Sequence, residues 1–318
     1  MHPEFARGRG VRSRKPCFAT IAASVLLLCA CRAQAVTYIQ GIDVYSGDGA
    51  VNWNSVKGAG YDFAFVKATE GVDFIDSRFA TNMTNANAAG VYVGPYHFAR
   101  PDSKNGVPFT SYNGAALTPT SPTQTNRDAW ADATSEAADF LDAIRPYYQQ
   151  TGNTHFLRPV ADLELSRIPD FGNTSLEKTF VSNWVQIFSD AIEDDLGVRP
   201  FMYLSKSSAN TYWTSTIASE HPFWIAQYKG TGTTATPTIA DTPLWPAWSF
   251  WQWSDGTDAI AQASLVPGVP VSPDRDVFSG TMGQLATFRL QVAVPEPTSC
   301  VLLCCSGVYL TLGRKRRS

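Results

Sequence analysis

Cysteine is absent from the middle of this 318-residue chain. The six cysteines all lie in two terminal segments, at Cys17, Cys29, Cys31, Cys300, Cys304 and Cys305. The stretch between Val36 and Val294 therefore has neither a disulfide nor thiol chemistry to support its fold or its activity.

Positive charge is also scarce in this middle region. The whole chain has a formal net charge of −3, and residues 1–35 and 295–318 contribute +5 and +3, which leaves −11 for the rest. A domain this acidic is poorly suited to binding the phosphate backbone of DNA or RNA, and nucleic acid is excluded as the expected partner.

Signatures of several common enzyme classes are missing. No strand-to-helix turn has a glycine-rich phosphate loop or a dinucleotide fingerprint, and no G-x-S-x-G nucleophile elbow occurs. Of only four histidines, neither His97 nor His155 has a partner at metal-ligand spacing. We therefore expect no cofactor and no metal, and we assign His97 no catalytic role.

Residues 1–35 are typical of a secretory signal peptide. A basic stretch precedes the apolar run FATIAASVLLLCA, and Ala33 and Ala35 give the small-x-small pattern that signal peptidase requires. Cleavage is expected after Ala35. The alternative is a lipoprotein anchored at Cys31.

Residues 295–318 contain Pro-Glu-Pro, a short apolar run and a basic terminus. The apolar run is shorter than the roughly 20 residues that span a bilayer. The segment resembles the PEP C-terminal sorting signal of Gram-negative bacteria, which implies an exosortase-type partner and a place in the cell envelope or at the cell surface; a weak tail anchor is the alternative. The mature domain would be residues 36–294, expected to be a monomer.

Eight near-continuous apolar runs predict strands covered on both faces, as in a parallel sheet. They are TYIQGIDVY, DFAFVKAT, VYVGPYHF, RPVADLEL, RPFMYLS, PFWIAQY, SFWQWS and RDVF. Helical segments that shorten toward the end separate the early runs, which favours an α/β fold of the incomplete β/α-barrel type. A doubly wound open sheet is the alternative.

Three helices have predicted ends. The first ends at Gly90, the second at Pro146, and the third begins with Thr174 or Ser175 as its cap and ends at Gly197.

Two acids, Asp162 and Glu164, interrupt the strand RPVADLEL. Side chains at i and i+2 share one face of a strand, about 6.6 Å apart, so both are expected to point toward the barrel axis. Crowding and burial would raise the pKa of one of them, as a general acid requires. The alternative is a buried acid paired with Arg or Lys for stability.

Further acids occupy similar places. Asp43 ends the first strand, and Asp274 begins the last one with Asp276 two residues on. Aromatic residues occur near these acids in the sequence, at Trp53, Tyr96, Trp224, Trp248, Trp251 and Trp253. Sugar rings pack their C–H faces on aromatic side chains, so the composition suits a carbohydrate cleft. Tyr96, Trp251 and Asp276 are the predicted substrate-binding residues.

These blocks resemble glycoside hydrolase family 25, the Chalaropsis-type lysozymes. The resemblance rests on residues 41–101 and on PVADLEL, FWIAQY, FWQWS and DRDVFSG. It implies a (β/α)5β3 barrel of TIM-barrel type that cleaves the β-1,4 bond between N-acetylmuramic acid and N-acetylglucosamine in peptidoglycan.

By the same resemblance, Glu164 is the proton donor, Asp162 its partner, and Asp43 and Asp274 the other active-site acids. The chain departs from the family in having Asp276 where Asn is common, Asn52 where Asp is common, and a long loop after Arg100. The covalent intermediate is left open between a glycosyl-aspartate and an oxazolinium. Two other functions are considered: a chitinase-like hydrolase, whose longer D-x-x-D-x-D-x-E run is missing here, and a catalytically silent glycan-binding barrel.

Overall fold

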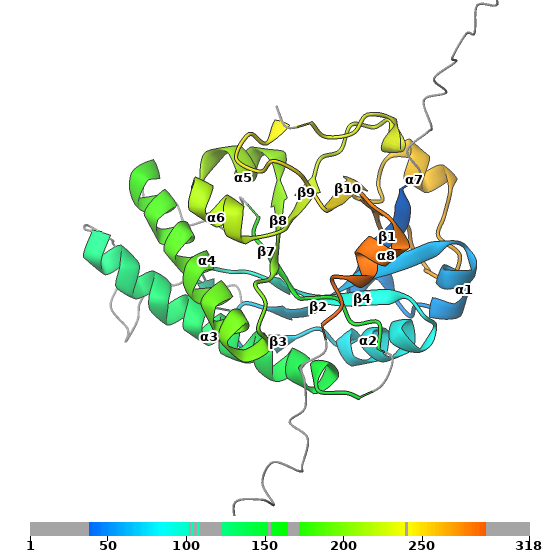
Figure 1. The fold of residues 1–318 in the computed structure, drawn as a ribbon, viewed down its shortest axis with the longest axis horizontal. Coiled ribbons are helices and arrows are strands. Elements are labelled where there is room, and N and C mark those ends of the chain that lie inside the picture. The colour runs from blue at the N-terminus through cyan, green and yellow to red at the C-terminus, as the bar shows by residue number, and fades with distance from the viewer. Residues whose placement is uncertain are drawn as a thin grey trace, which may run out of the picture. The chain divides into compact units, whose positions relative to one another are not determined.

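The computed structural model describes residues 38–101, 103–104, 107–108, 122–151, 154–164, 172–238 and 241–290 (Figure 1). The described residues belong to one compact unit that begins at Tyr38. The predicted signal peptide and the predicted sorting signal lie outside the described residues, as does most of the long loop after Arg100.

Eight strands form a closed barrel: β1 (Ile39–Val44), β2 (Tyr61–Glu70), β4 (Tyr92–Phe98), β7 (Val160–Asp162), β8 (Phe201–Ser205), β9 (Phe223–Ala226), β10 (Phe250–Ser254) and β11 (Asp274–Phe278). Short strand β3 (Phe74–Ile75) extends the end of β2, and β5 (Ser103–Lys104) pairs with β6 (Val107–Pro108). The helices are α1 (Trp53–Gly58), α2 (Phe79–Ala88), α3 (Pro122–Tyr148), α4 (Thr174–Leu196), α5 (Lys206–Thr211), α6 (Ser215–Glu220), α7 (Ala259–Ala263) and α8 (Met282–Ala286).

All eight strands expected from the apolar runs are present, and the barrel prediction is confirmed. The order around the barrel is β1, β2, β4, β7, β8, β9, β10 and β11, and β11 returns to β1 to close it. Every neighbouring pair is parallel except those of β11, which runs antiparallel to both β10 and β1. The parallel arrangement expected from the sequence therefore fails at this one strand.

The barrel interior is packed with aromatic rings. Phe65 stacks on Trp224 with 4.4 Å between ring centroids, and Phe250 lies 5.0 Å from both Phe63 and Phe65. Helix α8, which follows β11, places Leu285 in the same cluster. Because β11 is antiparallel, α8 closes the end of the barrel where the parallel strands begin, and the opposite end is left for a site.

A second apolar cluster lies between the strands and the helices outside them. Helices α3 and α4 lie side by side there (Figure 1). Phe140 of α3 and Phe188 of α4 stack with 5.9 Å between ring centroids, and both are fully buried. Strands covered on both faces explain the near-continuous apolar runs of the sequence.

Two helix ends differ from their predictions. Helix α3 passes Pro146 and ends at Tyr148, because a proline near the C-terminus removes only one hydrogen bond and Tyr148 is held by its hydroxyl, which donates to the Leu157 carbonyl at 2.6 Å. Helix α4 is capped by Asn173 and not by Thr174 or Ser175. The Gly197 end is confirmed by its left-handed φ of 73°.

Among the residues that the structure describes, no helix combines the length and the hydrophobicity needed to span a bilayer.

The packing of the barrel interior predicts the effect of one methyl group. A Cβ at Gly41 would lie 2.3 Å from the Phe63 ring, so Gly41→Ala should lower the free energy of unfolding by about 1–3 kcal/mol through overpacking. Gly58→Ala is the matched control, since a Cβ there meets nothing within 4 Å and alanine favours a helix. Chemical denaturation measures both, and equal stability of the two variants would contradict this packing.

Candidate active site

Four of the predicted acids reach the same end of the barrel. Asp43 lies near the end of β1, Asp162 ends β7, and Glu164 follows two residues later. Asp274 is the first residue of β11, and it pairs directly with Asp43 because β11 is antiparallel. The start of the last strand therefore lies where the parallel strands finish.

One cavity of about 220 Å³ receives these side chains, and we call it the acid cavity. It is lined by Asp43, Tyr45, Asp48, Lys67, Tyr96, Phe98, Asp162, Glu164, Tyr203, Trp224, Gln252 and Asp274. The i, i+2 spacing of Asp162 and Glu164 thus places both on the inner face of the barrel, as expected. Tyr96, predicted to bind substrate, also lines this cavity.

Burial and mutual repulsion perturb the acids. Burial, followed by the charge of Glu164, raises the pKa of Asp162, which confirms that crowding shifts one member of the pair. Burial also raises the pKa of Asp43. For Asp274, burial and the nearby Asp43 raise the pKa to about 9.

The side chain of Gln252, from β10, lies between two of these acids. Its Nε2 donates to Oδ2 of Asp43 at 2.7 Å and to Oδ2 of Asp274 at 2.9 Å. One amide therefore serves two carboxyl groups. Hydrogen bonds of this kind favour the charged form of an acid and offset part of the repulsion between neighbouring carboxylates.

Two tyrosines fix the orientation of this amide. The hydroxyl of Tyr203 donates to Oε1 of Gln252 at 2.6 Å, and the hydroxyl of Tyr228 donates to the same oxygen. Because two phenols converge on the carbonyl end, the NH₂ end faces the acids. The positions of Asp43 and Asp274 thus depend on a chain of hydrogen bonds that reaches β8 and the segment after β9.

Asp276, predicted to bind substrate, lies beneath the acid cavity and is not among the residues that line it. It points into the barrel but is fully buried, and Oδ1 accepts a hydrogen bond from Nε1 of Trp224 at 2.9 Å. Burial raises its pKa, and its carboxyl is hydrogen-bonded to Asp43. Two buried carboxyl groups in such contact titrate as a pair, so Asp276 supports Asp43 from below.

Trp251, also predicted to bind substrate, is not among the residues that line the acid cavity. Residues alternate along β10, and since Gln252 faces inward, Trp251 faces outward, where it is fully buried and donates from Nε1 to the Gln227 carbonyl at 2.9 Å. Of the six aromatics singled out in the sequence, only Tyr96 and Trp224 line the acid cavity. The other four, Trp53, Trp248, Trp251 and Trp253, pack in or against the outer apolar cluster.

The sequence reasoning missed a cation in the acid cavity. Lys67 of β2 lies with Nζ 2.5 Å from Oε2 of Glu70 and 4.6 Å from the centre of the Phe98 ring. Burial alone would raise the pKa of Glu70, but Lys67 and Arg100 lower it by hydrogen bonding and charge. The alternation of β2, whose inward phenylalanines precede Lys67 at intervals of two, was the signal that could have revealed it.

His97 faces the helices and not the cavity. Its Nδ1 lies 2.7 Å from Oγ1 of Thr69 and its Nε2 lies 2.6 Å from Oε2 of Glu136, and burial lowers its pKa to about 3. In the part of the chain that the structure describes, no three His, Cys, Asp or Glu side chains are grouped so that they could hold a metal ion.

Comparison with known proteins gives concordant matches. The family model for glycosyl hydrolases family 25 matches residues 42–113 and 126–260. Lysozyme M1 of Streptomyces globisporus is 30% identical over 250 residues, which cover 78% of this chain and 70% of that protein. The autolytic lysozyme of Clostridium acetobutylicum is 38% identical over 242 residues, which cover 76% of this chain and 56% of that protein.

A solved structure agrees with these matches. The bacterial lysozyme from Streptomyces coelicolor superposes with a TM-score of 0.58 at 28% sequence identity, over 80% of this chain and 98% of that one.

The raised pKa of Asp274 predicts how its replacement acts on stability. Folded Asp274 keeps its proton to about pH 9, whereas an unfolded aspartate loses it near about pH 3.9, so this residue's contribution to stability is lost as pH rises between these values. Asp274→Asn, which cannot ionise, should gain on the order of 1 kcal/mol at pH 8, or roughly 2–4 °C in Tm, and little at pH 4.

The control for this prediction is Asp194→Asn, at an exposed position on α4. It should change the free energy of unfolding only slightly, and by the same amount at both pH values. Denaturation of both variants from pH 4 to 8 is the measurement, and a gain for Asp274→Asn that does not grow with pH would contradict the assigned burial effect.

Proposed function

Because the chain belongs to glycosyl hydrolases family 25, we propose that it is a peptidoglycan hydrolase of the lysozyme type, which cleaves the β-1,4 bond between N-acetylmuramic acid and N-acetylglucosamine. The observation that carries the proposal is the convergence of Asp43, Asp162, Glu164 and Asp274 on one cavity at the carboxyl end of a β/α barrel. Glycosidases need paired carboxyl groups of this kind.

Glu164 is proposed as the general acid. It follows β7 at the mouth of the barrel and is partly exposed, so a glycosidic oxygen can approach its carboxyl group. In the first step it donates its proton to that oxygen while the bond to C1 breaks. The departing sugar leaves with a hydroxyl group, and positive charge develops on the sugar that stays.

Asp162 is proposed to stabilise that positive charge. Its side chain is buried, and no described group donates a hydrogen bond to its Oδ1. A buried carboxyl group with an unpartnered oxygen favours a cationic neighbour. The 2-acetamido group of the substrate supplies one, because its carbonyl oxygen bonds to C1 from the face opposite the leaving group and forms an oxazolinium.

Asp43 and Asp274 are proposed to complete the hydrogen-bonding wall of the acid cavity. Gln252 holds both through one amide, so the two carboxyl groups are fixed before substrate binds. Polar groups that are held in place before the reaction cost no reorganisation during it. Water then attacks C1 from the side of the departed sugar while Glu164 takes its proton, which retains the β configuration.

Neither alternative function is favoured. The relatives reported above carry the name lysozyme. A barrel that only binds glycan does not need the four acids, yet in this chain all four are present and line one cavity.

Export of the enzyme is part of the proposal. Residues 1–35 and 295–318 have the composition of a signal peptide and a PEP-type sorting signal, which would bring in signal peptidase and an exosortase-type enzyme as processing partners. The acting form would be a monomer in the envelope or at the surface of a Gram-negative bacterium, with peptidoglycan glycan strands as its substrate.

The products of digestion test this function. Purified peptidoglycan treated with the protein should yield new reducing ends of N-acetylmuramic acid, which NMR should detect first in the β form. Mass analysis after reduction identifies the terminal sugar. Reducing N-acetylglucosamine would make the protein a glucosaminidase, and an initial α product would contradict the retaining mechanism.

Removal of the proposed acid tests the role of Glu164. Glu164→Gln keeps the shape of the side chain but cannot release a proton, so kcat on peptidoglycan should fall roughly 10²–10⁴-fold with an unchanged Tm. Glu193→Gln, on the exposed face of α4, is the matched control and should keep full activity. Comparable turnover of the two variants would remove Glu164 from the mechanism.

A further inference from the structure

Tyr228 is held differently from the other tyrosine that orients the Gln252 amide. It lies two residues after the end of β9, and its ring is about half exposed, yet its hydroxyl donates to Oε1 of Gln252. Tyr203, which donates to the same oxygen, is buried and belongs to β8. A half-exposed ring is not fixed by packing as a buried one is, so the position of the Tyr228 hydroxyl depends on the backbone that carries it.

The backbone around Tyr228 belongs to no strand or helix, and the residues on both sides of it reach the same carboxylate. The N–H of Gln227 donates to the Gln252 carbonyl at 3.1 Å, and its Nε2 donates to Oδ1 of Asp241 at 3.3 Å. On the other side, Nζ of Lys229 lies 3.8 Å from Oδ2 of Asp241. The segment that carries Tyr228 is therefore anchored at Asp241 from both of its ends.

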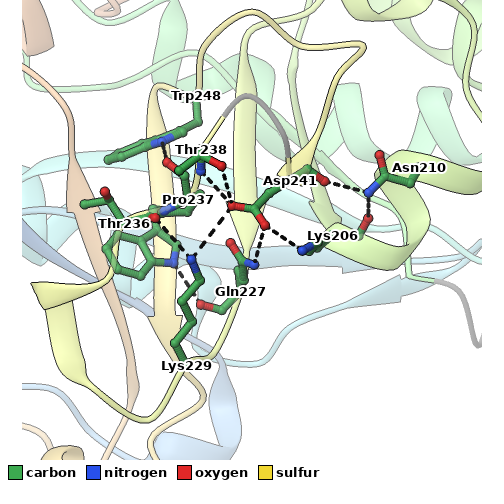
Figure 2. A network of polar contacts seen from close by, with 10 residues as sticks. Lys206, Asn210, Gln227, Lys229, Thr236, Pro237, Thr238, Asp241 and Trp248 are labelled. Carbon is green, nitrogen blue, oxygen red and sulfur yellow. Dashed lines mark hydrogen bonds and ion pairs between the residues drawn. The ribbon is translucent and has the colours of Figure 1, made fainter.

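Asp241 is the centre of a wider network (Figure 2). Its Oδ1 also accepts from Nζ of Lys206 at 2.5 Å, and its Oδ2 accepts from the N–H and the hydroxyl of Thr238 at 2.7 and 3.0 Å. Its backbone carbonyl accepts from Nδ2 of Asn210 at 2.6 Å. The residue thus joins the segment after β9 to helix α5 and to the chain that precedes β10.

These contacts fix the geometry of Asp241 more than they stabilise the fold. The side chain of Lys206 is 45% exposed, and ion pairs at such exposure contribute little to stability. Lys206, followed by the Thr238 N–H, lowers the pKa of Asp241, so the carboxylate is charged at neutral pH. A charged carboxylate with donors on both oxygens forms short, directional hydrogen bonds and has one orientation.

We propose that Asp241 is a positioning residue of the acid cavity. It fixes the segment that carries Tyr228, and Tyr228 in turn fixes the amide of Gln252. That amide donates to Asp43 and Asp274. Asp241 is not among the residues that line the acid cavity, so its effect on the acids passes through this chain of contacts. The inference rests on the proposed function, in which a displacement of about 1 Å can cost a large factor in rate.

Coupling between two substitutions tests the proposal. Tyr228→Phe removes the hydroxyl and Asp241→Ala removes the anchor, and each should lower kcat on peptidoglycan roughly fivefold or more. Because both act through one contact, the double variant should stay within about twofold of Tyr228→Phe, whereas independent losses would multiply to roughly 25-fold or more.

The matched control is Asp190→Ala, on the exposed face of α4. Like Asp241, this carboxylate accepts from a basic side chain and from a glutamine amide, those of Arg199 and Gln186. It is not among the residues that line the acid cavity, so its replacement should keep full activity.

A second measurement does not depend on catalysis. The side-chain N–H signals of Gln252, observed by NMR without substrate, report the hydrogen bonds of its amide. Asp241→Ala should shift them in the same direction as Tyr228→Phe does, while Asp190→Ala should leave them in place. If Asp241→Ala does not fold, Asp241→Asn serves in both measurements, since it keeps the volume but loses the charge and one acceptor oxygen.

Four outcomes overturn the proposal: full activity of Asp241→Ala, a double variant that loses clearly more than Tyr228→Phe, an equal loss in Asp190→Ala, or Gln252 signals that Asp241→Ala leaves unchanged. If the wild-type protein does not cleave peptidoglycan, the proposed function fails. The NMR comparison then decides by itself whether Asp241 positions the amide.

Discussion

The amide of Gln252 allows acids to stand close together at the mouth of the barrel. Carboxyl groups in one cavity repel one another, and burial adds to the cost of their charges. By donating to Asp43 and Asp274 at once, Gln252 reduces this repulsion, and Tyr203 and Tyr228 keep its donors aimed at the acids. The geometry of the acid cavity therefore depends on residues from four strands and on the segment after β9.

Apolar packing offsets the remaining free-energy cost of burying the acids. Interlocking rings fill the barrel below the acid cavity, and Trp224 belongs to both regions, since it stacks on Phe65 and donates to Asp276. No disulfide can contribute, because the described residues contain no cysteine. The raised pKa values of Asp43, Asp162 and Asp274 show that the fold sustains acids in places that disfavour their charge. Active sites commonly sacrifice stability in this way.

Most of the fold follows from the sequence because a barrel buried on both sides imposes continuous apolar runs. The acids follow for a related reason, since a carboxyl group in such a run must have a function or a partner. Composition does not say which face of a strand a residue occupies or how deep it lies, so the full burial of Trp251 and Asp276 outside the lining of the acid cavity could not be predicted. The antiparallel direction of β11 could not be predicted from the sequence either, since it depends on a long connection and not on the strand's own residues.

The position of Asp274 has a consequence for biosynthesis. Strand β11 is the last of the barrel, and it both supplies an acid and closes the sheet between β10 and β1. Before this strand leaves the ribosome, the barrel of a nascent chain is open and its acid cavity lacks Asp274. Premature termination upstream of β11 would therefore leave the sheet open between β10 and β1 and the acid cavity without Asp274.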